Sequence, residues 1–372
     1  MKVYMVGGAV RDELLGLPVK DRDYVVVGAS PERMIEQGYM PVGSDFPVFL
    51  HPETTEEHAL ARTERKTAPG YKGFVFHASP GVTLEEDLNR RDFTINAMAR
   101  DEQGRLIDPH GGESDLRLGL LRHVSDAFAE DPVRILRAAR FAARFGFAVA
   151  PGTMALMRAM VEAGEVDALV PERVWQEISR GLMELEPSRM FAVLRSAGAL
   201  ARILPEVDAL LAAPEGAPAL AALDETALRN APLPVRYAAL LRFLSGPDAA
   251  TSASARLKAP SDCRDLAIMS SRECAAISNA QSLSPEQLLE LVERCDALRR
   301  PARFGELIEA CDAARGPNAG DFPQRELLQR ALRAVQSVDA GAIAAARPAD
   351  LPGAIHAARL AAIRELARKD GA

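Results

Sequence analysis

The chain has 372 residues, of which 48% are hydrophobic and 26% charged, and its formal net charge is −7. This length allows two or three domains, each with its own core. No apolar run in the sequence approaches the length that crosses a bilayer, which excludes a membrane-spanning protein. The negative balance argues against non-specific adhesion to long nucleic acid, although a local basic patch still permits specific binding.

The start of the chain and its cysteines indicate a cellular compartment. The N-terminus runs directly into an apolar strand and a charged turn, without the pattern of a signal peptide. The four cysteines lie far apart and show no paired metal-binding spacing: Cys263, Cys274, Cys295 and Cys311. We therefore expect reduced thiols and a cytoplasmic location.

Residues 1–124 have the pattern of a mixed α/β domain. Apolar and β-branched runs predict strands at 3–6, 24–27, 48–50, 57–62 and 105–107. Amphipathic segments predict helices at 9–15, 31–37 and 94–99. Between these elements, residues 67–81 combine glycine and proline with large aromatic side chains, which is typical of a long functional loop.

From about residue 125 the pattern becomes helical. Asp131 and Pro132 predict a helix start, with Asp131 as the N-cap, and Gly146 offers a stop. Pro171 and Pro187 mark two further helix starts. We expect an α+β chain in three parts, which are residues 1–124, a helical part at 125–205 and a second helical part at 206–372.

Two carboxylates stand close together before an apolar strand. Asp21 and Asp23 are two residues apart, and residues i and i+2 of a strand point to the same side. Their like charges repel each other, and a hard cation such as Mg²⁺ relieves the repulsion. Glu64 is the candidate for a third carboxylate from a neighbouring strand. The pair also fits a solvated strand end at which Asp21 pairs with a neighbouring basic residue.

A glycine turn precedes these carboxylates. Gly7 and Gly8 lie between the strand predicted at 3–6 and the helix predicted at 9–15, and such a turn lets backbone N–H groups approach a phosphate. Together with the Asp21–Asp23 pair, the turn favours nucleotidyl or phosphoryl transfer. In a two-metal mechanism the ions activate the attacking hydroxyl and neutralise the transferring phosphoryl group.

Arginines complete the candidate site. Arg90 and Arg91 precede a predicted helix that Asp92 can cap. Paired arginines at this point can bind a triphosphate. Asp92 can alternatively accept a hydrogen bond from a ribose hydroxyl. Farther on, four arginines fall on one helical face within about 120°, with few acidic partners on that face: Arg134, Arg137, Arg140 and Arg144. Such a face fits either a solvated basic surface or donors to the edge of a nucleobase.

In this order and spacing, the motifs resemble the bacterial class II CCA-adding tRNA nucleotidyltransferases, which are related to DNA polymerase β. The resemblance covers residues 1 to about 205 and rests on GGAVRD, DRD, ALARTERK, RRDFTINAMA, IDPHGG and EDPVRILRAARFAARFG. It implies a polymerase β-like head of mixed sheet and helices, followed by an all-helical neck, body and tail. The implied reaction is template-independent addition of CCA to the 3′ end of tRNA from CTP and ATP, with release of pyrophosphate.

The resemblance also assigns roles to individual residues. Asp21 and Asp23 would hold Mg²⁺. Gly8 and Arg11 would contact the phosphates of the incoming nucleotide, and Arg91 would bind its triphosphate. Arg137 and Arg140 would line the nucleotide site. Asp131 and Arg134 would read the base of CTP or ATP, so that capping and base reading compete for Asp131. The loop at 67–81 matches the element linked to the change from CTP to ATP.

The region from residue 206 onwards departs from this family. Gram-negative members often carry an HD domain there, a metal-dependent phosphohydrolase that needs several histidines and an adjacent His-Asp pair. In this chain only His356 lies beyond residue 123, and Arg242 and Phe243 occupy the His-Asp places. We therefore expect an HD-like helical domain without metal ligands and without phosphohydrolase activity.

Other interpretations keep the same head motifs. A bacterial poly(A) polymerase shares them but tends to carry basic extensions, whereas this chain is acidic. A non-catalytic RNA-binding relative has no reason to keep the adjacent carboxylates Asp21 and Asp23. An enzyme that adds only CC is disfavoured because the 67–81 loop is present. The expected partners are tRNA, CTP and ATP, with no membrane. The sequence leaves open whether the protein is a monomer or a homodimer.

Overall fold

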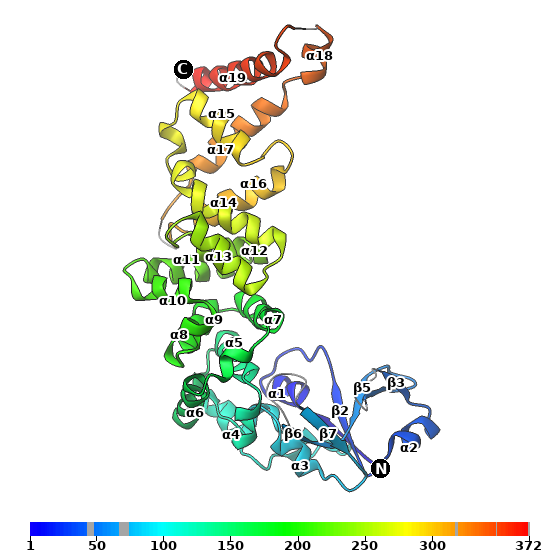
Figure 1. Cartoon of the computed structure of the whole chain (residues 1–372). Coiled ribbons are helices and arrows are strands. Elements are labelled where there is room, and N and C mark those ends of the chain that lie inside the picture. Colours follow the sequence, from blue (N-terminus) through cyan, green and yellow to red (C-terminus); the bar gives the residue numbers. More distant parts are fainter. Residues whose placement is uncertain (43–47, 67–73, 317–318, 347, 371–372) are drawn as a thin grey trace. The chain divides into compact units, whose positions relative to one another are not determined.

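The computed structural model describes residues 1–42, 48–66, 74–316, 319–346 and 348–370 (Figure 1). The chain divides into two compact units, which are described separately below. The first unit comprises residues 1–177 and 189–203, and the second comprises residues 178–188 and 204–372.

A mixed sheet organises the first half of the first unit. In the described residues, seven strands form this sheet in the order β3-β4-β5-β2-β1-β8-β9, and β2 and β5 pair in parallel. The strands are β1 (Lys2–Val6), β2 (Asp23–Val27), β3 (Met40–Val42), β4 (Val48–Leu50), β5 (Glu57–Leu60), β8 (Ala99–Arg100) and β9 (Leu106–Ile107). A separate antiparallel hairpin joins β6 (Arg62–Lys66) and β7 (Phe74–Ala78).

Alternation along β2 sends its side chains to both faces of the sheet, where helices cover them. The first three helices are α1 (Gly8–Leu14), α2 (Pro31–Glu36) and α3 (Leu84–Asn89). Val25 lies in a buried cluster with Leu88 of α3, whereas Val26 lies in a second cluster with Met34 of α2. Because both clusters exclude water, the packing fixes the register of β2. Asp23 therefore stands at the end of a firmly held central strand.

Most of the elements predicted in this region are confirmed. The strands at 3–6, 24–27, 48–50 and 105–107 and the helices at 9–15 and 31–37 agree with the structure to within one residue at each end. The strand predicted at 57–62 is instead two strands. The chain leaves the sheet at Ala61, whose N–H donates to the carbonyl of Val26, and continues into the β6–β7 hairpin.

Two predictions in this region are wrong. The helix predicted at 94–99 is a single 3₁₀ turn, η2 (Thr94–Asn96), after which Ala99 pairs with Val6 of β1. Pairing with the sheet edge outweighs the local helical pattern there. Residues 74–78 of the predicted loop form β7, and residues 67–73 lie outside the described residues.

The rest of the first unit is mainly helical. Its elements are α4 (Gly112–Leu118), β10 (Leu120–Leu121), η3 (Asp126–Glu130), α5 (Val133–Phe145), β11 (Ala148–Val149), α6 (Pro151–Glu162), η4 (Glu165–Ala168), α7 (Pro171–Leu182), α8 (Pro187–Ser196) and α9 (Ala199–Ile203), with α7 continuing into the second unit. As predicted, α5 ends at Gly146, which has a φ of 70°. The expectation of helix throughout is wrong at β11, which pairs in parallel with β10.

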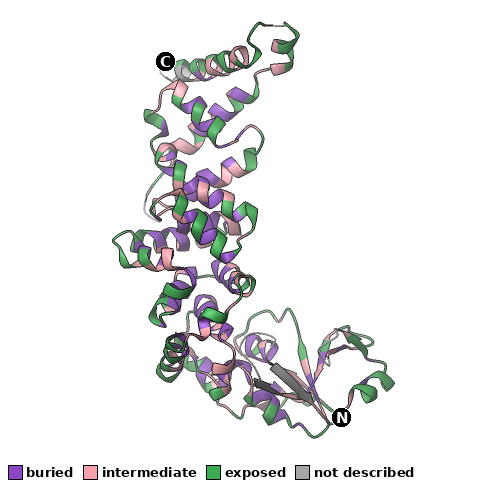
Figure 2. Cartoon of the chain, viewed as in Figure 1, coloured by how far each residue is buried: buried purple, intermediate pink, exposed green. Residues whose placement is uncertain are grey.

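In its described part, the second unit consists of helices and their connections, as predicted. They are α10 (Pro205–Ala212), α11 (Gly216–Leu228), α12 (Leu233–Leu241), α13 (Pro247–Leu257), α14 (Ser261–Ser278), η5 (Ala280–Ser282), α15 (Pro285–Arg294), α16 (Pro301–Ala313), α17 (Pro323–Gln336), α18 (Ala340–Ala345) and α19 (Leu351–Asp370). Figure 2 shows buried residues concentrated in α12 and α14, which pack closely together. Among the described residues, no helix combines the length and apolarity that crossing a membrane requires.

The prediction of four reduced cysteines is wrong for two of them. Cys274 of α14 and Cys311 of α16 form a disulfide, with their Cα atoms 5.5 Å apart. The two residues are 37 positions apart in the sequence, and packing of α14 against α16 brings them together. Cys263 and Cys295 are free and buried, and burial raises the pKa of each thiol to about 12.

Candidate active site

The turn between β1 and α1 requires glycine. Gly7 has a φ of 67°, a conformation that other residues adopt only with strain, and its N–H donates to the carbonyl of Met98. A Cβ at Gly7 would lie 2.8 Å from Nη1 of Arg91. The arginine therefore passes directly over the turn. A glycine turn beside a guanidinium offers backbone N–H groups and a positive charge to the same anion.

Asp23 lies within reach of the charge of Arg91. Asp23 opens β2, opposite Val6 of β1. Burial raises the pKa of Asp23, the positive charge of Arg91 lowers it, and the negative charge of Asp21 raises it, with a net shift upwards. Asp21 precedes the strand, so the same-side argument from strand geometry does not apply to it. The mutual repulsion that the sequence predicted is nevertheless present.

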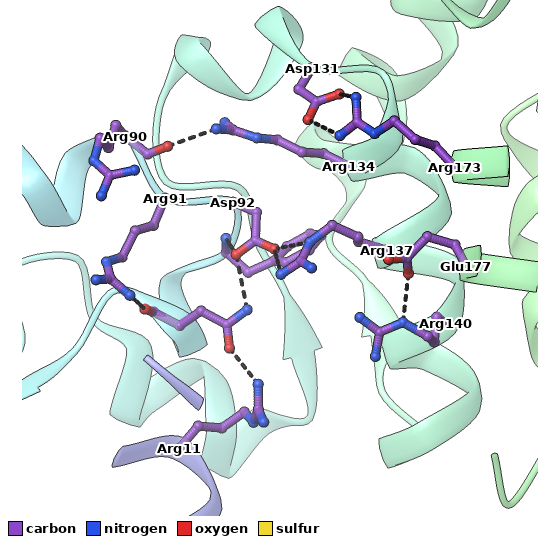
Figure 3. Close-up of polar contacts among 12 residues, drawn as sticks. Arg11, Arg90, Arg91, Asp92, Asp131, Arg134, Arg137, Arg140, Arg173 and Glu177 are labelled. Atoms are coloured by element: carbon purple, nitrogen blue, oxygen red, sulfur yellow. Dashed lines mark hydrogen bonds and ion pairs between the residues drawn. The ribbon is translucent and has the colours of Figure 1, made fainter. Parts of the chain in front are cut away.

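Asp92 joins the RRD segment to α5, and this role differs from the predicted helix cap. One carboxylate oxygen accepts from the backbone N–H of Phe93 and from the side-chain amide of Asn96, and the other accepts from Nε of Arg137 at 2.7 Å (Figure 3). Burial alone would raise the pKa of Asp92, but the charge of Arg137 and the two side-chain hydrogen bonds lower it to about 2. Asp92 is therefore ionised wherever the protein is folded near neutral pH.

This ion pair predicts a pH-dependent contribution to stability. The pKa of Asp92 falls from 3.8 to about 2 on folding, which corresponds to about 2 kcal/mol. Because the folded pKa is depressed, the contribution is present above about pH 4 and is lost as the pH falls towards 2. We expect Asp92→Asn to reduce the free energy of unfolding by this amount at pH 7 and by less at pH 3. Urea unfolding followed by fluorescence of the single tryptophan, Trp175, measures the difference.

A matched control for this prediction is Asp167→Asn. Asp167 pairs with Arg202, and about half of each side chain is exposed, so its replacement should change stability by less than about 1 kcal/mol. Equal losses in the two variants, or a loss at Asp92 that does not change with pH, would contradict the prediction.

Arg11 supports the site from within. It is 4% exposed, and its guanidinium donates to Asp12 and, through Nη1, to Oδ1 of Asn96 at 2.6 Å. The same group lies over the rings of Phe141 and Phe145 of α5. Asn96, which the sequence analysis did not single out, therefore links Arg11 to Asp92.

The arginine face of α5 is paired, which sequence analysis of the helix alone could not reveal. Its ion pairs are Arg137 with Asp92, Arg140 with Glu177 at 2.6 Å, and Arg144 with Asp12 at 3.0 Å. All three acidic partners come from other elements of the first unit. None of these partners lies at an i±4 position, because each is more than 30 residues from its arginine in the sequence.

Asp131 and Arg134 lie at the start of α5. Asp131 is not the N-cap that the sequence predicted, because α5 begins at Val133 and its N-cap is Pro132. One carboxylate oxygen of Asp131 nevertheless accepts from the Val133 N–H at 3.0 Å. The other oxygen pairs with Arg173, which sequence analysis missed. Arg134 donates to the carbonyl of Arg90 at 2.8 Å (Figure 3). Asp131 and Arg134, the two residues assigned to base reading, are thus held in place by contacts with Val133, Arg173 and Arg90.

One predicted site residue cannot be placed. The backbone of Glu64 belongs to β6, where it pairs with Phe76 of β7, but its side chain lies outside the described residues. Its role as a third carboxylate therefore stays a prediction.

Arg242 and Phe243, which the sequence analysis assigned to the places of an HD pair, lie side by side. The guanidinium of Arg242 lies 4.5 Å from the ring centre of Phe243, and burial lowers the pKa of Arg242. Phe243 also lines a cavity of about 460 Å³. His356 lies 3.8 Å from a carboxylate oxygen of Glu293. Within the described ranges, no three His, Cys, Asp or Glu side chains gather as a metal site requires.

Comparison with known proteins identifies the family. Residues 3–122 match the family model of the poly A polymerase head domain, and residues 146–211 match the model described as a probable RNA and SrmB-binding site of polymerase A. A multifunctional CCA protein of Herminiimonas arsenicoxydans is 55% identical, and the match covers 98% of this chain and 97% of that protein. This chain belongs to the multifunctional CCA protein family. A second member, from Aromatoleum aromaticum, is 56% identical over 98% of both chains.

Solved structures agree with membership of this family. The Bacillus stearothermophilus CCA-adding enzyme in complex with CTP is 27% identical, with a TM-score of 0.73, and the match covers 98% of this chain and 89% of that one. The Thermotoga maritima CCA-adding enzyme complexed with tRNA shares the fold at 21% identity, with a TM-score of 0.67 and coverage of 99% and 91%. The fold is therefore that of a CCA-adding enzyme, with a polymerase-type head of mixed sheet and helices followed by a mostly helical remainder.

Nucleotidyltransferases of this family depend on a divalent metal. The donors of this chain fit such an ion, because Asp21 and Asp23 offer carboxylate oxygens, which hard divalent cations prefer.

Proposed function

We propose that this protein adds CCA to the 3′ end of tRNA without a nucleic-acid template, using CTP and ATP and releasing pyrophosphate. One structural observation carries the proposal: Arg91 lies against the glycine turn at Gly7 and acts electrostatically on Asp23. A triphosphate held by Arg91 would thus have its α-phosphate beside the carboxylates. Membership of the multifunctional CCA protein family supports the same reaction and substrate.

We propose that the metal is Mg²⁺ and that Asp21 and Asp23 hold it, with Glu64 as the third carboxylate. The ion would lower the pKa of the primer hydroxyl and offset negative charge on the transferring phosphoryl group. The protein contributes the rest through positioning. Arg91 holds the triphosphate in line with the primer hydroxyl, and Gly8 offers its backbone to the phosphates.

Selection of the nucleotide falls to the start of α5. We propose that Asp131 and Arg134 present an acceptor and donors to the base edge, so that a wrong base leaves buried groups unpaired. The remaining residues of the site are Arg11, Asp92, Arg137 and Arg140. Arg11 and Asp92 are hydrogen-bonded to Asn96, Arg137 to Asp92, and Arg140 to Glu177, and we propose that these contacts keep the site rigid. Rigid walls allow two pyrimidine additions and one purine addition to be distinguished by hydrogen bonding.

We also propose the division into a head at 1–124, a neck at 125–205 and a body and tail at 206–372, with tRNA as the nucleic-acid partner. The cytoplasm is the proposed location because tRNA substrates reside there.

Incorporation of labelled CTP and ATP tests the proposal. The substrates are tRNA ending at the discriminator base, at C and at CC, supplied with Mg²⁺. Two additions of C followed by one A and a stop are expected. Long A tails would instead indicate the poly(A) polymerase whose head-domain model the chain matches. Addition that ends after CC would indicate a CC-only enzyme, and no incorporation would favour a non-catalytic RNA-binding protein.

The helical body should lack phosphohydrolase activity. We propose this because Arg242 and Phe243 stand at the His-Asp places and only His356 lies beyond residue 123. The measurement is hydrolysis of 2′,3′-cyclic phosphates and phosphomonoesters by the pure protein with Mg²⁺, Mn²⁺, Ni²⁺ or Co²⁺. Metal-dependent turnover that persists in Asp23→Asn would contradict the proposal, because that variant leaves the body unchanged.

A further inference from the structure

Asp87 is a buried carboxylate that no motif assignment uses. It lies on α3, which begins with a capping box between Thr83 and Glu86. The side chain of Asp87 is fully buried on the inner side of this helix. A carboxylate in such a place is costly unless cations and hydrogen bonds compensate for its lost hydration.

Two arginines provide that compensation. One oxygen of Asp87 accepts from Nη2 and Nε of Arg90, at 2.6 and 3.1 Å, and the other accepts from Nη2 of Arg91 at 3.1 Å. Burial raises the pKa of Asp87, but the charges and hydrogen bonds of Arg90 and Arg91 outweigh it, and the net shift is downwards. Asp87 is therefore an anion that binds one arginine with each oxygen.

These contacts extend to the nucleotide site in two directions. On one side, Arg91 passes over Gly7 and donates to the backbone carbonyl of Asn96. On the other side, Arg90 donates to the carbonyl of Arg62 in β6, and the carbonyl of Arg90 accepts from Arg134 (Figure 3). Asp87 itself accepts from the N–H of Arg62. The carboxylate of Asp87 thus links β6 to Arg91, which lies over the glycine turn, and, through Arg90, to Arg134 at the start of α5.

Arg91 keeps a donor that these contacts do not use. Within the described residues, Nε of Arg91 is buried and has no hydrogen-bond partner. Asp87 and the backbone carbonyl of Asn96 accept from the two Nη atoms of Arg91 and so fix the position of its guanidinium. A guanidinium that is already held in place binds phosphate with little further loss of side-chain freedom.

We propose that Asp87 is a positioning residue of the nucleotide site, which orients Arg91 towards the triphosphate and, through the Arg90 carbonyl, orients Arg134 towards the base. Affinity for the triphosphate and selection of the base are then coupled through one buried carboxylate. This inference rests on the proposed function, because the ligands of Arg91 and Arg134 are those assigned there.

The test compares Asp87→Asn with Glu273→Gln. Glu273 is also a buried carboxylate bound by two arginines, Arg272 and Arg294, but it lies in the second unit and has no role in the proposed nucleotide site. We expect Asp87→Asn to raise the KM for both CTP and ATP by about tenfold or more and to increase incorporation of UTP in place of CTP. Glu273→Gln should leave both quantities near the wild-type values even where it lowers the unfolding temperature.

A double variant separates positioning from a general loss of structure. If Asp87 acts through Arg91, the effect of Asp87→Asn on KM should vanish in the Arg91→Ala background. A KM effect that persists there, or equal KM effects of Asp87→Asn and Glu273→Gln, would overturn the proposal. Should Asp87→Asn fail to fold, Asp87→Glu keeps the charge but displaces Arg91 by one methylene; an unchanged KM in a folded Asp87→Glu protein would also overturn it.

Equilibrium binding of CTP keeps this inference distinct from the proposed reaction. If wild-type protein incorporates no nucleotide but binds CTP, and Asp87→Asn weakens that binding by about tenfold, the proposed reaction fails and the positioning role stands. If CTP does not bind to the wild-type protein, both fail. If CTP binds equally to the wild-type and Asp87→Asn proteins, the positioning role fails alone.

Discussion

Replacement of Asp23 with asparagine should reduce nucleotide incorporation by about a thousandfold or more, because metal-supplied charge stabilisation is worth several kcal/mol and each 1.36 kcal/mol is tenfold in rate. Asp23 is the exposed first residue of a central strand, and its carboxylate is close enough to Asp21 for that negative charge to raise its pKa. An amide of the same shape binds a hard divalent cation far more weakly than a carboxylate does. Packing of β2 should be unaffected, since Val25 and Val26 keep their clusters.

The measurement is single-turnover addition of CTP to tRNA, together with CTP binding in the absence of metal. We expect the rate to fall while metal-free binding changes little, because Arg91 is intact. Glu36→Gln is the control, since Glu36 is an exposed carboxylate on α2 that pairs with Arg33, and it should behave as wild type. Wild-type rates in Asp23→Asn, with Mg²⁺ at any concentration, would remove Asp23 from the metal site.

The sequence predicts the parts of this site well but not their connections. The Gly7–Gly8 turn and the strand after Asp23 follow from local rules, because turn chemistry and β-branched runs act over a few residues. The end of α5 at Gly146 is local in the same sense, and its start lies within two residues of the predicted cap. Such features depend on residues that are neighbours in the sequence, so they can be predicted before the fold is known.

The partners of the arginines could not be predicted in this way. Arg140 pairs with Glu177 and Arg144 pairs with Asp12, and both contacts need the fold to bring distant residues together. The helix predicted at 94–99 fails for a related reason, since Ala99 pairs with the sheet edge at β1. Asp87 is the one missed residue with a local signal: its spacing of three and four from Arg90 and Arg91 places all three on one helical face.

Substitution of Gly112 should have the largest effect on stability, because the structure leaves no room for a side chain there. A Cβ at Gly112 would lie 2.2 Å from the carbonyl oxygen of Thr94 and 2.9 Å from Cγ of Met98. The obstacle is backbone, so it cannot be relieved by rotation of a side chain. We expect Gly112→Ala to destabilise the first unit by about 3 kcal/mol or more.

The same substitution should impair the site. The Thr94 carbonyl accepts from the N–H of Ala97, and this bond closes η2, which carries Asn96 between Arg11 and Asp92. Displacing the carbonyl therefore moves Asn96. We expect nucleotide incorporation by Gly112→Ala to be reduced even at temperatures at which the variant is folded. This result would distinguish a displaced site from a smaller folded population.

Gly152→Ala provides the matched control. Gly152 lies in the first turn of α6, where an added Cβ meets no atom within 4 Å. Alanine is the better helix former, so this change should be neutral or slightly stabilising. Thermal unfolding of both variants, read at Trp175, makes the comparison. If Gly112→Ala unfolds at the wild-type temperature, then α4 must be able to move away from η2, and the contact between Gly112 and Thr94 does not hold the RRD segment in place.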